Sequence, residues 1–211
     1  KSPSMQEEGS VNLLCQQEVQ HAIAHRLYNA LLKEQGYPVE RDRRVLRRML
    51  RFFDRWFSVK MRLSMVVFGE HLTHLLGQKA LRETNGIPRP NALTRFWAWH
   101  AYEECEHSCA AFDLYQDVSG SYWRRMAGML CYFVPFTITV FFAGAVFVKS
   151  EGPRRGWGAW LRVVLRELKP GGWLADVAYG SLLYLSPWFN PRRHADPVVL
   201  EDWRRQNPAV S

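Results

Sequence analysis

A dense group of titratable side chains interrupts an aromatic stretch near the middle of the chain. The segment WHAYEECEHSCAAFD, residues 99–113, holds three glutamates and two histidines within eight positions. On an α-helix, His100, Glu103 and His107 lie within about 100° of Glu104, so these four side chains share one face. Glu104 and His107 form an E-x-x-H pair one turn apart, which can grip one cation together.

The same pattern recurs in an earlier segment. Glu18 and His21 form a second E-x-x-H pair, and His25 follows one turn later on the same face. A segment between the two pairs carries Glu70, with His74 one helical turn further on. Two E-x-x-H pairs and additional single glutamates are the ligand set of carboxylate-bridged dimetal helical bundles. Such oxygen and nitrogen donors favour two iron ions, or an iron and manganese pair, over zinc.

The spacing of the glutamates supports a shared site. A turn rich in Gly and Pro, NGIPRPN at residues 85–91, centres near Ile87. Glu70 and Glu104 lie equally far from Ile87 along the chain, one before it and the other after it. In an antiparallel helical hairpin, these two carboxylates therefore lie at the same level.

The alternative interpretation is a set of solvated ion pairs, which is what one E-x-x-H pair on a helix usually is. Two copies, each flanked by large apolar residues, favour a metal site, because a buried carboxylate is costly unless it is paired or metal-bound. The predicted metal ligands are Glu18, His21, Glu70, Glu104 and His107. Glu103 and His100 are assigned to catalysis, and His25 and His74 are expected to orient the ligands.

A complete site of this type needs one more helix with a glutamate upstream of Glu18. Only the short segment 1–17, which starts at Lys1, precedes Glu18 in the sequence. We expect either that this helix lies before the given sequence or that Glu103 takes its place, and we favour the first interpretation.

The elements that must position these residues are all helical. Helices are expected at residues 10–34, 40–82 with a break near Asp54–Ser58, 92–117, 156–168 and 173–186, followed by a Pro-rich polar tail. No segment alternates at period two over a useful length, so the fold class is all-α. We expect a ferritin-like bundle over residues 1–118, and an apolar helical extension with a basic tail over 119–211 that packs on the bundle or on a membrane.

The uncharged run at residues 131–148 has a length at the threshold for a membrane span. Three interpretations stay open: a buried core helix, a segment in or on a membrane, and one wall of a channel for a greasy substrate. Its aromatic residues and basic flanks fit an interface with anionic lipid.

Composition limits the classes of partner. The 211 residues carry a formal charge of +8, much of it in short arginine-rich runs. No zinc-finger spacing, RNA-binding motif or basic heptad accompanies these runs, so we expect no nucleic acid partner. The four cysteines form no C-x-x-C pair, which indicates a reduced, cytoplasmic protein, either free or at the inner membrane.

Four stretches make the chain resemble a bacterial family of predicted metal-dependent hydrolases: QQEVQHAIAHRLYN (16–29), GEHLTH (69–74), WHAYEECEHSCAAFD (99–113) and LYLSPWFNP (183–191). The resemblance implies a ferritin-like helical fold and a metal site at the five predicted ligands. Ser108, Trp188 and Asn190 depart from the family pattern, and the family's early glutamate segment is not found.

The ligand set favours an O₂-activating di-iron oxygenase or oxidase acting on a lipophilic small molecule. One alternative is a hydrolase that uses a metal-activated water. A second is a non-catalytic metal-binding or membrane-associated bundle. The expected partners are the lipophilic substrate, with a membrane surface, an electron donor protein and a second copy of the chain as further candidates.

Overall fold

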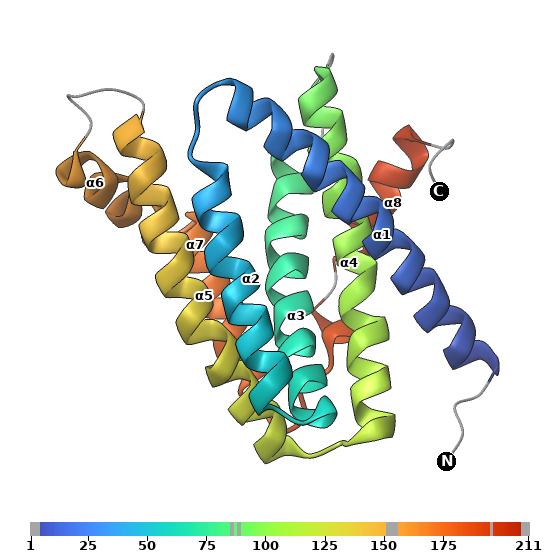
Figure 1. The fold of residues 1–211 in the computed structure, drawn as a ribbon. Coiled ribbons are helices and arrows are strands. Elements are labelled where there is room, and N and C mark those ends of the chain that lie inside the picture. Colours follow the sequence, from blue (N-terminus) through green and yellow to red (C-terminus); the bar gives the residue numbers. More distant parts are fainter. Residues whose placement is uncertain (1–4, 85–86, 88–89, 151–155, 195, 208–211) are drawn as a thin grey trace.

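The protein is a bundle of helices. The computed structural model describes residues 5–84, 87, 90–150, 156–194 and 196–207. Within these ranges the chain forms eight α-helices and one short 3-10 helix, and no strand (Figure 1). The predicted all-α class is therefore confirmed.

The centre of the bundle is an antiparallel hairpin of α3 (Val59–Thr84) and α4 (Ala92–Val118). Gly77 allows these helices to approach closely, because a Cβ there would lie 2.6 Å from the carbonyl oxygen of Ala101. The predicted turn at 85–91 lies mostly outside the described residues. Its last residue, Asn91, caps α4 by accepting a hydrogen bond from the backbone N–H of Thr94.

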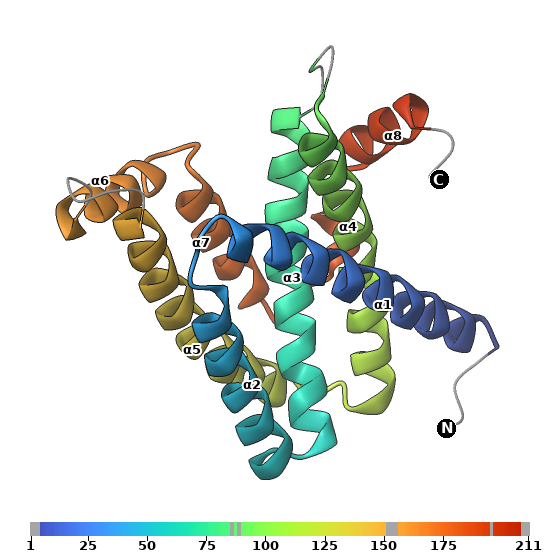
Figure 2. The same cartoon turned by 45° about the horizontal axis from the view of Figure 1, so that its top comes forward.

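Helix α1 (Met5–Glu34) crosses α4 at an angle (Figures 1 and 2). A short connection leads to α2 (Val39–Trp56), which ends where the sequence predicts a break, before α3 begins. Helix α2 is loosely held, because Val39 is its only buried residue.

The uncharged run lies inside α5 (Tyr122–Ser150), which packs along α3 and is followed by α6 (Trp157–Glu167). By length and composition α5 could cross a membrane, and only 6% of its most apolar 18-residue window is buried within the fold. The interpretation of this run as a buried core helix is therefore wrong.

The C-terminal part returns to the hairpin. Helix α7 (Trp173–Tyr184) packs on α3, η1 (Pro191–Arg193) on α4, and α8 (Pro197–Gln206) on α3. The expected polar tail is thus partly helical. Asp196 caps α8, Pro197 occupies its first turn, and Val199 is buried against the hairpin. The division into units at residues 1–118 and 119–211 stays a prediction.

Two apolar clusters hold the helices together, one on each side of the middle of the hairpin. One joins α3, α4, α5 and α7 and includes Phe68, Phe112 and Tyr184. The other joins the opposite end of the hairpin to α8 and includes Leu81 and Tyr102. The rings of Tyr102 and Trp203 stack with their centroids 4.3 Å apart.

Candidate metal centre

Donor groups from α1 and α4 converge at one point of the bundle. One ligand atom from each of Glu18, His21, Glu104 and His107 can be chosen so that all four atoms lie within 4.8 Å of one another. The two histidines and Glu104 are buried, whereas the side chain of Glu18 is 48% exposed. The two E-x-x-H pairs therefore meet, with Glu18 on the solvent side.

His21 is held by its outer nitrogen. Its Nε2 donates a hydrogen bond to Oε2 of Glu103 at 2.8 Å. Its Nδ1 lies 3.3 Å from Oε1 of Glu104 and 3.9 Å from Oε1 of Glu18. A proton on Nε2 leaves the Nδ1 lone pair directed toward the other carboxylates, as in the carboxylate–histidine pairs that orient metal ligands.

His107 is held in the same way. Its Nε2 donates to Oε1 of Gln17 at 3.2 Å, and Nε2 of Gln17 in turn donates to Oε1 of Glu103 at 3.4 Å. Its Nδ1 lies 3.1 Å from Oε1 of Glu18. Gln17 thus connects His107 to Glu103, the partner of His21.

Glu70 of α3 reaches the same group. Its Oε2 lies 3.7 Å from Nδ1 of His107, and Oε2 of Glu104 lies 4.0 Å from that atom. The hairpin thus brings Glu70 and Glu104 to one level. Burial, followed by the charges of Glu104 and Glu18, raises the pKa of Glu70 to about 8.

Three buried atoms in this group, Nδ1 of His21, Nδ1 of His107 and Oε2 of Glu70, have no hydrogen-bond partner among the described residues. A buried polar atom without a partner costs free energy, and a cation placed between these atoms would satisfy them together. The donor set, carboxylate oxygen and imidazole nitrogen, is suited to divalent transition metals. The residues present therefore fit a metal ion.

The electrostatics of the group also favour a cation. Burial disfavours the charged form of His21, but contacts with Glu104, Glu103 and Glu18 outweigh it and raise its pKa. Burial opposes ionisation of Glu104, yet the proximity of His21 and Thr73 and the charges of His100 and His107 lower its pKa. Several carboxyl groups share this space, and the raised pKa of Glu70 reflects how unfavourable a further negative charge is there, so a cation would stabilise them.

The remaining predicted residues lie at different distances from this point. Nε2 of His100 is 3.4 Å from Oε1 of Glu104, and burial followed by the charge of His21 lowers the pKa of His100 to about 4. The ring of His25 packs on that of His100 at a centroid distance of 4.8 Å. Burial and the charge of His21 lower the pKa of His25.

His74 belongs to a second histidine group on the other side of α3. Its Nδ1 donates to the carbonyl of Cys105 at 3.1 Å, and its Nε2 accepts from Gln78 at 2.6 Å. His71 donates from Nε2 to the carbonyl of Gly180 at 3.0 Å. These contacts fasten α4 and α7 to α3, and neither histidine has a described carboxylate within ion-pair distance.

Sequence reasoning missed Gln17 and Thr73. Gln17 directly precedes Glu18, and it also lies in the stretch QQEVQH that carries the family resemblance. That position is the one signal that could have found it. The hydroxyl of Thr73 donates to the backbone carbonyl of Glu70 at 3.1 Å and lies close enough to Glu104 to lower the pKa of that carboxyl.

Comparison with known proteins bears on the chemistry. A family model described as predicted metal-dependent hydrolase matches residues 1–195. No curated protein and no solved structure matches the chain. This match overturns the oxygenase expectation, and with it the reason for an electron donor, because the family is described by hydrolysis. The expectation failed because carboxylate and imidazole ligands hold a cation in either chemistry and do not by themselves select the reaction.

Proposed function

The chain belongs to the family of predicted metal-dependent hydrolases, and from that premise we propose that it hydrolyses an ester or amide bond at the centre formed by α1, α3 and α4. The metal ligands in this proposal are Glu18, His21, Glu104 and His107, with Glu70 completing the set.

One observation carries the proposal. Both imidazoles in the centre have their Nε2 atoms engaged by Glu103 or Gln17, while both Nδ1 atoms are buried, unpartnered and directed toward carboxylates. Solvated ion pairs would not need this arrangement, because water would satisfy the imidazoles. Ligands held ready for a cation require it.

A bound divalent metal would supply Lewis acidity and lower the pKa of a water molecule. The chain's own residues do the rest. Glu103 and Gln17 accept hydrogen bonds from the Nε2 atoms, so Nδ1 is the nitrogen of each ring that would face a bound cation. His100 is neutral near pH 7 because its pKa is about 4, so its Nε2 can carry a proton beside Oε1 of Glu104.

Access to the centre is expected from the side of Glu18, because that side chain is half exposed and the other donors are buried. A substrate carbonyl entering there would meet the donor group first. We keep iron or manganese as the proposed metal, and two ions as the proposed number, because the donors are oxygen and nitrogen atoms without thiolate.

The test combines metal analysis with anaerobic turnover. Purified protein is stripped with a chelator, reloaded separately with Fe²⁺, Mn²⁺ or Zn²⁺, and assayed without O₂ on a panel of ester and amide substrates. We expect turnover that follows metal occupancy and that disappears in the Glu104→Ala, His107→Ala double variant.

Glu106→Gln is the matched control, because Glu106 lies on the same helix and contacts Tyr102 and Arg204 instead of the centre. It should retain metal and turnover. Hydrolysis that persists in the stripped protein would refute the proposal, as would loss of metal from the control alone.

A further inference from the structure

Helices α2, α5 and α6 expose apolar side chains that nothing in the described chain covers. On α5, Leu130, Val134, Ile138 and Phe142 follow one another at four-residue spacing, and each is at least half exposed. On α6, the exposed residues Trp157, Leu161 and Leu165 repeat the same spacing. We call these two stripes together with α2 the basic–apolar face.

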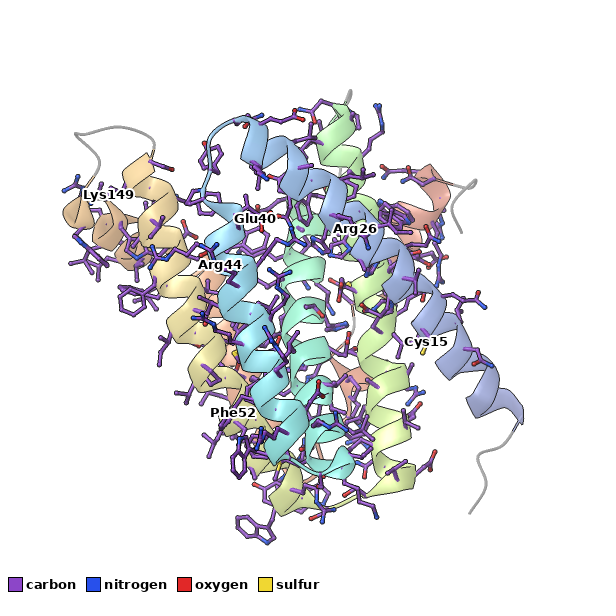
Figure 3. The ribbon with its side chains drawn as sticks, viewed as in Figure 1. Cys15, Arg26, Glu40, Arg44, Phe52 and Lys149 are labelled. Atoms are coloured by element: carbon purple, nitrogen blue, oxygen red, sulfur yellow. The ribbon has the colours of Figure 1, made fainter. Side chains whose placement is uncertain are left out.

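Helix α2 joins these stripes at their edge. It runs beside α5 in both views of the fold (Figures 1 and 2), and Figure 3 shows Arg44 and Phe52 on it. Around its axis, apolar residues such as Leu46, Leu50 and Trp56 occupy one side and arginines occupy the other. All three of these apolar residues are exposed.

The charge of the basic–apolar face is strongly positive. Helix α2 carries seven arginines against three acidic residues, and α5 carries no acidic residue. Two of the three acids are already paired, Glu40 with Arg43 and Asp54 with Arg62. No acidic side chain of the described residues lies within ion-pair distance of Arg44, Arg47 or Arg48.

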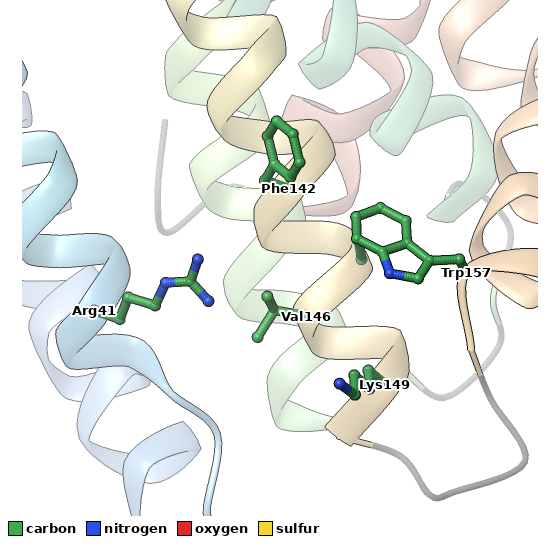
Figure 4. Close-up of a pocket in the computed structure, with 6 residues that line it drawn as sticks. Arg41, Phe142, Val146, Lys149 and Trp157 are labelled. Atoms are coloured by element: carbon green, nitrogen blue, oxygen red, sulfur yellow. The ribbon is translucent and has the colours of Figure 1, made fainter.

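Cationic and apolar groups also meet in a pocket between these helices. The pocket holds about 190 Å³ and is lined by Arg41 of α2, by Phe142, Val146 and Lys149 of α5, and by Trp157 of α6. Figure 4 shows the guanidinium of Arg41 directed toward α5. A guanidinium beside apolar side chains suits a ligand that has an anionic group next to a hydrocarbon chain.

We propose that the basic–apolar face docks this protein on the surface of a bilayer rich in anionic phospholipid. Amphipathic arginine-rich helices with Trp, Phe and Leu on the opposite side lie in the membrane interface in this way. Anionic headgroups complement the arginines of α2, and the acyl region receives the exposed stripes of α5 and α6. The pocket accepts one headgroup phosphate beside Arg41 and Lys149.

Docking on the surface fits the fold better than a span through the bilayer. Gly128 of α5 packs against Ser64 of α3 so closely that a Cβ there would lie 2.2 Å from the serine hydroxyl oxygen. Helix α3 also carries Glu70 into the polar metal centre. A spanning α5 would draw this centre toward the hydrocarbon core, where ionised groups are costly.

Vesicle flotation tests the proposal with the full chain. The protein is mixed with vesicles of phosphatidylcholine alone, or of phosphatidylcholine with roughly one third phosphatidylglycerol, at low salt and at about 1 M salt. We expect flotation with the anionic vesicles only, and its loss at high salt. Equal flotation with both kinds of vesicle, or none, would overturn the proposal.

Two variants locate the contact. The first is a triple variant of α2, Arg44→Gln, Arg47→Gln, Arg48→Gln. Its partitioning onto anionic vesicles should be about 100-fold weaker than that of the parent, the effect of three basic residues near a charged surface. The second is a double variant of α5, Val134→Gln, Ile138→Gln. It should weaken partitioning onto the vesicles by at least about tenfold, because apolar contact with the acyl region is lost. Circular dichroism shows whether each variant is folded.

The matched control removes three arginines elsewhere, Arg26→Gln, Arg193→Gln, Arg205→Gln, and should bind almost as the parent does. Equal losses in the control and in the α2 variant would overturn the proposal, because net charge alone would then explain binding. A second outcome would also overturn the proposal. The parent protein would be a dimer that does not bind vesicles, and the double variant Val134→Gln, Ile138→Gln would be a monomer. A second copy of the chain, and not a membrane, would then cover the α5 stripe.

Discussion

The bundle holds two groups of buried histidines, one between α1 and α4 and one on α3, and their surroundings are opposite. In the first, which we call the carboxylate cluster, His21 and His107 face Glu18, Glu70 and Glu104 with unpartnered Nδ1 atoms. In the second, the carbonyl cluster, His71 and His74 donate to backbone carbonyl groups. The residue type is the same, so the partner of each imidazole decides its role.

This difference in partners assigns the carboxylate cluster to metal binding and the carbonyl cluster to the stability of the fold. Carbonyl oxygens fix a neutral imidazole and tie distant segments together, as His71 does for α7 through Gly180. Carboxylates carry a net charge that the fold alone cannot balance, so the carboxylate cluster calls for a cation. Removing a histidine should therefore cost metal in one cluster and stability in the other.

The largest expected effect is on metal binding. His107→Ala should lower metal affinity by at least about 100-fold, more than the cost of removing an outer partner of a ligand. His74→Ala should leave the metal content unchanged although the residue is as deeply buried. Metal analysis after dialysis at graded free metal measures both. Equal losses from the two variants would erase the distinction between the clusters.

A smaller effect is expected from the residues that hold the ligands. Gln17→Ala removes the acceptor at Nε2 of His107 and the donor to Glu103. We expect metal affinity to fall by about 10-fold to 100-fold, as for other partners of metal-bound histidines.

Gln16→Ala is the neighbouring control for Gln17→Ala, because that side chain is exposed. It should behave as the parent does. Metal titration that gives the same curve for both variants would show that Gln17 does not position His107.

The sequence contained most of the carboxylate cluster, because its residues recur at helical spacing. The E-x-x-H pairs name four donors, and equal distances from Ile87 place Glu70 beside Glu104. Gln17 carries no charge and belongs to no pair, so spacing alone does not reveal it. The assignment of these residues to metal binding remains a prediction that the variants above test.

The carbonyl cluster and the C-terminal helix were harder to predict. His74 follows Glu70 by one helical turn, so helical spacing placed it near the ligands. It turns instead toward the carbonyl of Cys105, a tertiary contact that leaves no pattern in the sequence. Helix α8 was missed because it is short and lies in a Pro-rich, polar tail, and the burial of Val199 follows only from where the hairpin lies.

The role of the carbonyl cluster is tested by the free energy of unfolding. His71→Ala leaves the carbonyl of Gly180 without its donor and opens a cavity beside Tyr184 and Phe189. The free energy of unfolding should fall by about 2–4 kcal/mol. Chemical denaturation of metal-free protein measures it, with Glu18→Gln as the control, which should cost less because Glu18 is half exposed and its removal takes one negative charge out of a crowded group of carboxylates. A larger loss for Glu18→Gln would reverse the comparison.

The smallest expected effect is a pH dependence of stability that His74 contributes. Burial lowers the pKa of His74 below its ordinary value of 6.5 and outweighs the hydrogen bond to the carbonyl of Cys105, which raises it. The unfolded chain then binds a proton at a higher pH than the folded chain does. Stability from this group is therefore complete above about pH 6.5 and is lost as the pH falls toward the folded pKa.

The variant His74→Gln removes this titration and keeps a side chain that can donate to Cys105. Denaturation curves of metal-free parent and variant between about pH 5 and pH 8 should converge as the pH falls, because only the parent loses this contribution. The carboxylate cluster titrates in both proteins, so its contribution cancels when the unfolding free energies of parent and variant are subtracted. A difference that does not change with pH would mean that His74 keeps its ordinary pKa, and that burial does not hold it neutral.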